Sequence, residues 1–407
     1  MARVSPLRAM HDNAGAAAAP WGPAEADVLV PQAFAELELE YAAIRKTAAL
    51  FDQPQRGTLV ITGADRFAFL NRMVTQELKG FDTPFQCRRT FWLNRKGRID
   101  ADLRLIETGD GTIADVDVFA AERARAGLAA FMITEDVAIE DASETYHRLA
   151  LHGPLAPRII EAISRVKAGP AVGDLLPGGA CVTEIAGCEV IVDRWDALGE
   201  IGLELLVRRA DAENACRELL AFAHEHEGHA SPTGSPRPEL RLRPAGWRAY
   251  NIARIEAGTP IYNIDFGPDS LPHETGVHRD RVSFTKGCYL GQEVVARMES
   301  RGHSKRTLVG VRCGPPAAPE GGAGTPFDRP MPVSGSPIFA SDAPDAEAVG
   351  VVTSATLSPM LGAAAIGFAA VKPAQAAAGT TVFVEAEGER VRARVQPSLA
   401  SYARTAG

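Results

Sequence analysis

The chain of 407 residues has no long run of lysine and arginine, and its formal net charge at pH 7 is −8. Broad electrostatic binding of nucleic acid needs clustered basic side chains, so we expect no direct nucleic-acid partner. A short basic cluster at residues 297–306 fits a solvated face as well as a site for an anionic ligand tail. No apolar stretch reaches the length of a membrane span or of a signal-peptide core, so we expect a cytoplasmic protein without a membrane partner.

Cysteine pairs at metal-site or redox spacing are also missing. None of the six cysteines forms a C-x-x-C pair, which argues against a zinc ribbon and a thioredoxin-type site, and we expect reduced thiols. His224, His226 and His229 invite a metal site. However, the first two point to different sides of a helix that runs into a Pro/Ser/Gly loop, so we expect a solvated helix end and no metal site.

The chain does have enough apolar residues, 46%, for a large core and two or three domains. Helical and strand patterns alternate in a β-α-β-β-α-β rhythm, which is typical of ferredoxin-like halves packed around antiparallel sheets. This predicts an α+β fold with a strand-rich C-terminal end. Residues 1–28 are Ala/Gly/Pro-rich and aperiodic, and we expect a flexible tail there.

The octapeptide KGCYLGQE, residues 286–293, carries the strongest local signal. It places Cys288 between Lys286 and two glycines, just before a predicted helix over residues 293–298. A thiolate is favoured beside a lysine and near a helix N-terminus, so we expect Cys288 to be more reactive than a buried structural thiol. The plainer interpretation is a Gly-rich turn that happens to contain a cysteine.

A second signal is a hairpin turn at residues 94–97, followed by an alternating strand. Apolar side chains occupy one face of this strand, and Asp100, Asp102 and Arg104 occupy the other. A solvated sheet face explains this pattern without any function.

The octapeptide resembles the K-G-C-[YF]-x-G-Q-E signature of the YgfZ family, and the resemblance extends from about Phe34 to the C-terminus. Members of that family bind folate, assist iron–sulfur proteins, and are related to the glycine-cleavage aminomethyltransferase (T-protein). The resemblance implies an aminomethyltransferase-like ring of three regions: a folate-binding domain at residues 29–150, a second α+β domain with the octapeptide at 151–304, and a C-terminal β-barrel at 305–407.

The resemblance also implies residues that bind a reduced folate such as tetrahydrofolate. Glu200 lies in LGEIGLE, which is similar to the family's T-G-E-x-G-[FY]-E, and would accept two hydrogen bonds from the pterin. Arg254 and Tyr262 lie in a segment similar to R-x-E-A-G-x-P-x-Y. Arg254 would steady the anionic folate tail, although a surface ion pair with Glu256 is an alternative.

Asp102 corresponds to the second aspartate of a G-G-x-x-D-D segment in the aminomethyltransferases, where that residue acts at the folate nitrogen. The second glycine of the segment is Arg98 here, and the first aspartate is Ala101. The transferase constellation is therefore incomplete, and the sequence leaves open whether the protein is an enzyme.

Taken with the octapeptide, the resemblance predicts a tetrahydrofolate-binding accessory protein for iron–sulfur cluster assembly or repair, and so for iron–sulfur-dependent tRNA modification. Cys288, Lys286 and Asp102 would be its catalytic residues, and its partners would be iron–sulfur proteins or assembly factors. One alternative is a folate-dependent aminomethyltransferase of the glycine-cleavage type. Another is a folate-gated scaffold without catalysis.

Overall fold

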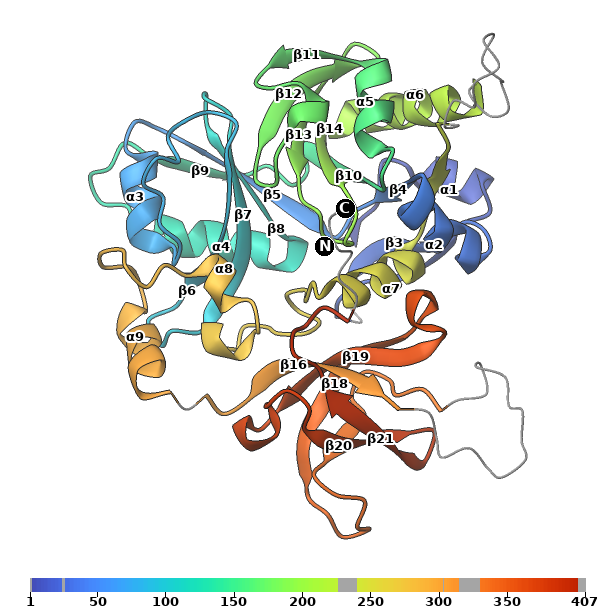
Figure 1. Ribbon diagram of the computed structural model, residues 1–407. Helices are drawn as coiled ribbons and strands as arrows, with labels where there is room; N and C mark the ends of the chain where they lie inside the picture. Colours follow the sequence, from blue (N-terminus) through green and yellow to red (C-terminus); the bar gives the residue numbers. More distant parts are fainter. Residues whose placement is uncertain (1, 24–25, 226–239, 303, 315–329, 402–407) are drawn as a thin grey trace. The chain divides into compact units, whose positions relative to one another are not determined.

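The computed structural model describes the whole chain except residues 1, 24–25, 226–239, 303, 315–329 and 402–407 (Figure 1). The chain divides into two compact units. Unit 1 consists of Met1–Thr90 and Ala101–Tyr250, and unit 2 consists of Phe91–Asp100 and Asn251–Gly407. Within the described ranges, no helix combines the length and the apolar character needed to cross a membrane.

A seven-stranded sheet with the order β11-β12-β13-β14-β10-β4-β15 forms the larger part of unit 1. Its strands are Ser164–Ala168, Ala180–Ile185, Cys188–Arg194, Gly202–Arg208, Tyr146–His152, Ala48–Asp52 and Leu242–Pro244, in that order. Helices α5 (Ala156–Ile163) and α6 (Ala212–Glu225) lie along it (Figure 1) and share its apolar core, because their buried Ile159, Ile160 and Leu219 meet valines and leucines of the strands.

Unit 1 also contains strands of a five-stranded sheet with the order β6-β7-β8-β5-β9. These strands are Cys87–Leu93, Ile99–Glu107, Thr112–Asp117, Arg56–Thr62 and Ala138–Asp141. The predicted alternation on β7 is confirmed, since Ile99, Ala101, Leu103 and Leu105 are all buried. Unit 1 also contains helices α2 (Leu37–Lys46), α3 (Arg66–Met73) and α4 (Val118–Ala129), with short turns η1 (Val172–Asp174) and η2 (Arg209–Asp211).

The N-terminal segment differs from the predicted flexible tail. It forms a helix and a small sheet of order β1-β3-β2: α1 (Arg8–Asn13), β1 (Ala2–Arg3), β2 (Ala17–Pro20) and β3 (Asp27–Ala33). The physical reason is burial. Leu7 is 1% exposed, and Ser5 and His11 both hydrogen-bond the buried carboxylate of Asp52, at 2.6 and 2.7 Å. Composition alone did not reveal these anchors.

Unit 2 ends in a closed barrel with the order β16-β19-β18-β17-β20-β21. Its strands are Thr307–Cys313, Ala364–Val371, Ala348–Ser358, Pro337–Phe339, Thr381–Ala386 and Glu389–Val395, with turns η4 (Pro359–Leu361) and η5 (Pro373–Gln375) between them. Valines such as Val311, Val352 and Val384 fill its interior. This confirms the predicted C-terminal barrel.

Helical segments precede the barrel: α7 (Trp247–Ala257), which begins in unit 1, then η3 (Pro272–Glu274), α8 (His278–Arg281) and α9 (Gln292–Arg301). Helix α7 ends just before Gly258, which takes a φ of +76°, a conformation that glycine adopts without strain. The proposed domain boundaries remain predictions. The one at residues 150/151 falls inside strand β10, and the one at 304/305 falls just before β16.

Candidate functional site

Glu200 is a buried carboxylate in the turn between β13 and β14 of unit 1. Arg45 from α2 holds the turn: its Nη1 donates to the carbonyl of Leu198 at 2.6 Å and lies 3.7 Å from Glu200 Oε1. Gly199 has a φ of +80°, and a Cβ at Gly202 would meet the Trp195 carbonyl oxygen at 2.1 Å. The two glycines on either side of Glu200 are therefore required by the backbone.

Asp102 lies half-buried on β7, on the face opposite the apolar side chains. Arg104, two residues further on the same face, is only 5% exposed, so this face is not the solvated surface that the plainer interpretation expects. Its guanidinium reaches carboxylates of three other strands, on β8, β13 and β14: Asp115 at 3.1 Å, Asp193 at 3.3 Å and Glu204 at 3.5 Å.

These residues and Arg148 of β10 form what we call the Arg104 cluster: Arg104, Arg148, Asp115, Asp193 and Glu204. Arg148 contacts Asp115 at 3.1 Å and Asp193 at 3.2 Å. Burial outweighs the two arginines and raises the pKa of Asp193 to about 6. The pKa of Asp115 falls below its usual range, because Arg148, Arg56 and Arg104 together overcome the opposing effect of burial. The only sequence signal for this cluster was charged residues inside apolar strand patterns.

Arg254 of α7 is fully buried in unit 2, and this corrects its predicted role. Its Nη1 pairs with Asp265 Oδ2 at 2.6 Å, its Nη2 donates to Ser354 Oγ at 2.6 Å, and its Nε donates to Asn251 Oδ1 at 2.9 Å. A folate tail would have to displace these partners. We therefore assign Arg254 to a structural network, named here the Arg254 network: Arg254, Asp265 and Ser354.

A second hydrogen bond joins the same two elements. Glu256, two residues after Arg254, accepts a hydrogen bond from Ser358 Oγ, four residues after Ser354 on β18. Both members of each pair are buried. Arg254 and Glu256 of α7 thus fix the helix to β18 of the barrel within unit 2, and neither residue lies at the surface.

Tyr262 is also buried, and its hydroxyl lies 3.2 and 3.0 Å from the backbone carbonyl oxygens of Ile99 and Asp100. Both carbonyls belong to the hairpin tip Phe91–Asp100, which is part of unit 2. The predicted turn there is confirmed by the hydrogen bond from Gly97 N to the Asn94 carbonyl, at 2.9 Å. Tyr262 therefore anchors the hairpin tip, and its predicted contact with a cofactor remains a prediction.

The octapeptide packs against this hairpin tip. Gly291 has a φ of +81°, and a Cβ there would lie 2.8 Å from the carbonyl oxygen of Asn94. Cys288 is the one exposed thiol of the six, whereas Lys286 is 6% exposed with its Nζ 5.3 Å from the centre of the Tyr289 ring. The prediction of an exposed loop is correct for Cys288 and wrong for Lys286, because the lysine packs over an aromatic ring.

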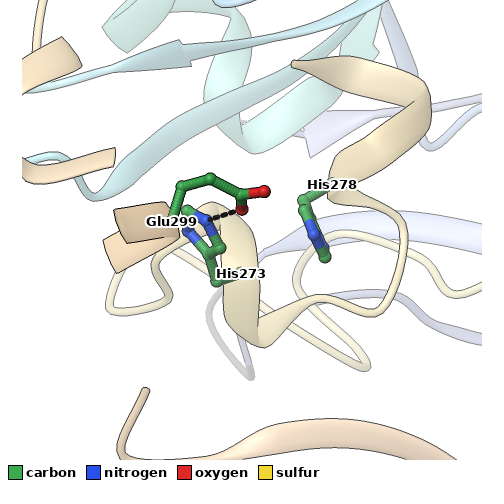
Figure 2. A group of neighbouring side chains, drawn as sticks. All are labelled: His273, His278 and Glu299. Atoms are coloured by element: carbon green, nitrogen blue, oxygen red, sulfur yellow. Dashed lines mark hydrogen bonds and ion pairs between the residues drawn. The ribbon is translucent and has the colours of Figure 1, made fainter. Parts of the chain in front are cut away.

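A cluster that the sequence did not reveal lies nearby in unit 2 (Figure 2). His273, His278 and Glu299 come from η3, α8 and α9, and one ligand atom from each lies within 4.8 Å of the others. The pattern was hidden because the glutamate lies 21 positions after the second histidine. Of the histidines that the sequence did suggest, His226 and His229 lie outside the described residues.

Comparison with known protein families identifies the family of this chain. Residues 7–286 match the family described as the GCVT N-terminal domain, and this match covers more than half of the chain. The chain belongs to the GCVT family. Residues 324–400 match the glycine cleavage T-protein C-terminal barrel domain, in agreement with the closed barrel.

Curated relatives of this GCVT-family chain are named aminomethyltransferase. That of Geobacillus kaustophilus is 27% identical over 398 residues, covering 98% of each chain, and that of Rubrobacter xylanophilus is 28% identical over 347 residues, covering 84% of this chain and 81% of the relative. The solved structure of glycine cleavage system aminomethyltransferase T from Bartonella henselae is 20% identical, with a TM-score of 0.78 over 97% of this chain and 96% of that one. These findings confirm the predicted fold class.

Proposed function

We propose that this chain binds a reduced folate and acts as an aminomethyltransferase of the glycine-cleavage type. Relatives with that name match it over nearly its whole length, which supports the transferase above the iron–sulfur role that the octapeptide suggested. The observation that carries the proposal is Glu200, a buried carboxylate in a turn whose backbone requires two glycines.

The residues of unit 1 suit a reduced folate. A pterin presents an amino group beside a ring N–H, and the two oxygens of Glu200 are a matching pair of acceptors. The guanidinium of Arg45 lies 3.7 Å from Glu200 Oε1. Tetrahydrofolate would supply the nitrogens that accept the one-carbon unit, and Asp102 would move a proton at those nitrogens.

Binding of tetrahydrofolate to the full chain, measured by calorimetry, tests the proposal. We expect Glu200→Gln to weaken binding at least tenfold, because it replaces one charged acceptor by a donor; this corresponds to the 1.5–3 kcal/mol, approximately, of a hydrogen bond to a charged group. The matched control is Glu189→Gln, an exposed glutamate on β13, which should bind like the wild type. Equal affinities of Glu200→Gln and wild type would exclude the assigned pterin site.

A second assay tests transfer. The chain is given tetrahydrofolate and an aminomethyl-lipoyl carrier, and methylenetetrahydrofolate is measured. Asp102→Asn should lower kcat by about 10²–10⁴, the usual contribution of a general acid–base group. The control is Asp100→Asn, two residues away on the same strand face. Folate binding without any product in the wild type would leave a folate-binding protein that is not a transferase.

The iron–sulfur accessory role is the second candidate, and it is favoured by Cys288, the exposed thiol inside the complete octapeptide. Iron–sulfur enzyme activities in a strain lacking this protein should be restored by the wild type and by Cys188→Ala, which removes a buried thiol. If Cys288→Ala restores them equally, this candidate fails. Folate binding with unaffected partners in both Cys288→Ala and Asp102→Asn would instead indicate a folate-gated scaffold.

A further inference from the structure

We propose that His273, His278 and Glu299 bind a divalent transition-metal ion of the Zn²⁺ type (Figure 2). Figure 2 shows the three side chains directed toward a common space, from three different elements. Two imidazoles and a carboxylate are a ligand set that zinc takes in proteins, with further positions left for water or another ligand. The inference is independent of the folate proposal.

The spacing of the donor atoms suits such an ion. His273 Nε2 lies 3.0 Å from Glu299 Oε2. Ligands about 2.1 Å from a tetrahedral zinc are about 3.4 Å from each other, so this pair already has nearly the required separation. The His278 ring is stacked on that of His273, with centroids 5.0 Å apart and an interplanar angle of 29°. All three donors lie within 4.8 Å, so small side-chain rotations complete the set.

Local backbone geometry explains how two histidines five positions apart meet. Gly276 lies between them with a φ of +70°, a conformation that glycine adopts without strain. The chain turns there, so that η3 and α8 face α9. A Cβ at Gly276 would meet Leu399 Cδ1 at 2.9 Å, so the turn is packed tightly from behind.

Each of the two histidines has a buried ring nitrogen without a hydrogen-bond partner in the described part of the chain. Nδ1 of His273 and Nδ1 of His278 are buried and have no partner among the described residues. Hydrogen bonding within the described residues therefore does not account for the placement of both rings.

One neighbouring side chain, that of Arg279, opposes metal binding. Arg279 Nη2 lies 3.6 Å from Glu299 Oε1, and its side chain is largely exposed. Its charge repels a cation and competes for the same carboxylate, so removing it should strengthen metal binding. A bound ion would join α9 to η3 and α8. Because α9 begins at Gln292, inside the octapeptide, the ion would also stabilise the segment that carries Cys288.

The test uses the full chain with Cys288→Ser, which removes the exposed thiol as a competing ligand, after treatment with a chelator. Co²⁺ is titrated and its visible absorption bands are recorded; Zn²⁺ affinity is measured by calorimetry. We expect one Co²⁺ per chain, at least tenfold weaker binding in His278→Ala and in Glu299→Gln, and several-fold tighter binding in Arg279→Gln. Glu299→Gln retains an acceptor for His273 and is the variant least prone to misfold.

The matched control replaces His224, His226 and His229 together by asparagine and should retain the site. If this control abolishes binding while His273→Ala and His278→Ala do not, the ion sits elsewhere and the proposal is wrong. The absence of Co²⁺ bands in the Cys288→Ser chain would equally overturn it. Amide hydrogen exchange gives a second readout: Zn²⁺ should slow exchange in α9 of the wild type and have no such effect in His278→Ala.

Discussion

The two units of this chain bury arginine among carboxylates in different ways. In the Arg254 network, Nε, Nη1 and Nη2 each donate a hydrogen bond of 2.6–2.9 Å to a side chain. In the Arg104 cluster, the arginine lies 3.1–3.5 Å from three carboxylates, yet none of its nitrogens makes a hydrogen bond of good geometry within the described part of the chain. The Arg254 network pairs one arginine with one carboxylate, whereas the Arg104 cluster sets two arginines against three carboxylates. The hydrogen bonding of the central arginine is complete only in the first.

This difference in hydrogen bonding should give the two sets of residues different effects on stability. The Arg254 network acts as a structural clamp, whereas the central arginine of the Arg104 cluster lacks hydrogen bonds of good geometry among the described residues. Buried ion pairs recover their desolvation cost only when hydrogen bonds accompany the Coulomb attraction. We expect the Arg254 network to stabilise unit 2 strongly. The Arg104 cluster should contribute less, and it contains a carboxylate, Asp193, that takes up a proton readily because its pKa is raised.

The largest expected effect comes from breaking the clamp. Arg254→Met leaves the Asp265 carboxylate buried without its counterion, which costs about 3–5 kcal/mol. Hydrogen exchange should show this loss in α7 and β18 of unit 2, whereas β13 and β14 of unit 1 serve as internal controls. The double variant Arg254→Met/Asp265→Leu should recover part of the stability. Unchanged protection of α7 in the single variant would contradict the assignment of Arg254 as a clamp.

The Arg104 cluster should make the stability of unit 1 depend on pH. Between about pH 4 and pH 6 the folded chain holds a proton on Asp193 that the unfolded chain, with the ordinary pKa of 3.8, has lost. Stability from this group is therefore present at low pH and falls by about 2–3 kcal/mol as the pH rises through this window. Asp193→Asn removes that slope.

The measurement is hydrogen exchange of β13 and β14 at several pH values, corrected for intrinsic exchange rates. Comparison with the variant is essential because His278, with a lowered pKa, adds a slope of opposite sign over the same range. That contribution is common to both proteins and cancels in the difference. Parallel curves for wild type and Asp193→Asn would show that Asp193 is ionised throughout.

A glycine substitution tests whether the stability of unit 2 depends on close packing as well as on hydrogen bonds. Gly291→Ala forces an alanine into positive φ against the Asn94 carbonyl, and we expect a loss of about 1–2 kcal/mol and faster thiol labelling of Cys288. Gly287→Ala is the matched control, since a Cβ there meets nothing within 4 Å. Equal labelling rates in the two variants would rule out packing of the octapeptide on the hairpin tip.

The smallest effect is expected at the surface of unit 1. Arg217 and Glu213 form an ion pair of 2.6 Å on α6, with both side chains largely exposed. Arg217→Ala should change stability by less than about 0.5 kcal/mol, because solvent and salt screen exposed charges. A loss comparable to that of Arg254→Met would mean that burial is not what distinguishes the ion pairs of this chain.

Local patterns in the sequence were sufficient for most elements. The turn at residues 94–97 and the alternation of β7 were both predicted correctly, because each depends on side chains close together in the chain.

Interactions between distant segments could not be predicted in this way. Asp193 and Glu204 face each other directly across β13 and β14, and Arg104 reaches them from a different sheet. Nothing in the pattern around Arg254 revealed that Ser354, one hundred residues later, would saturate its guanidinium. The roles that the family resemblance implies for its positions depend on packing partners that only the three-dimensional structure supplies.

The closed barrel has a consequence for how the protein tolerates high concentration. Each of its strands is hydrogen-bonded on both sides, so it offers no open edge on which another chain could add a strand. The seven-stranded sheet does end in an edge strand, β11, and exposed Arg165 and Lys167 occupy it. Like charges on two such edges repel each other, so strand-by-strand aggregation is opposed by closure in one place and by charge in the other.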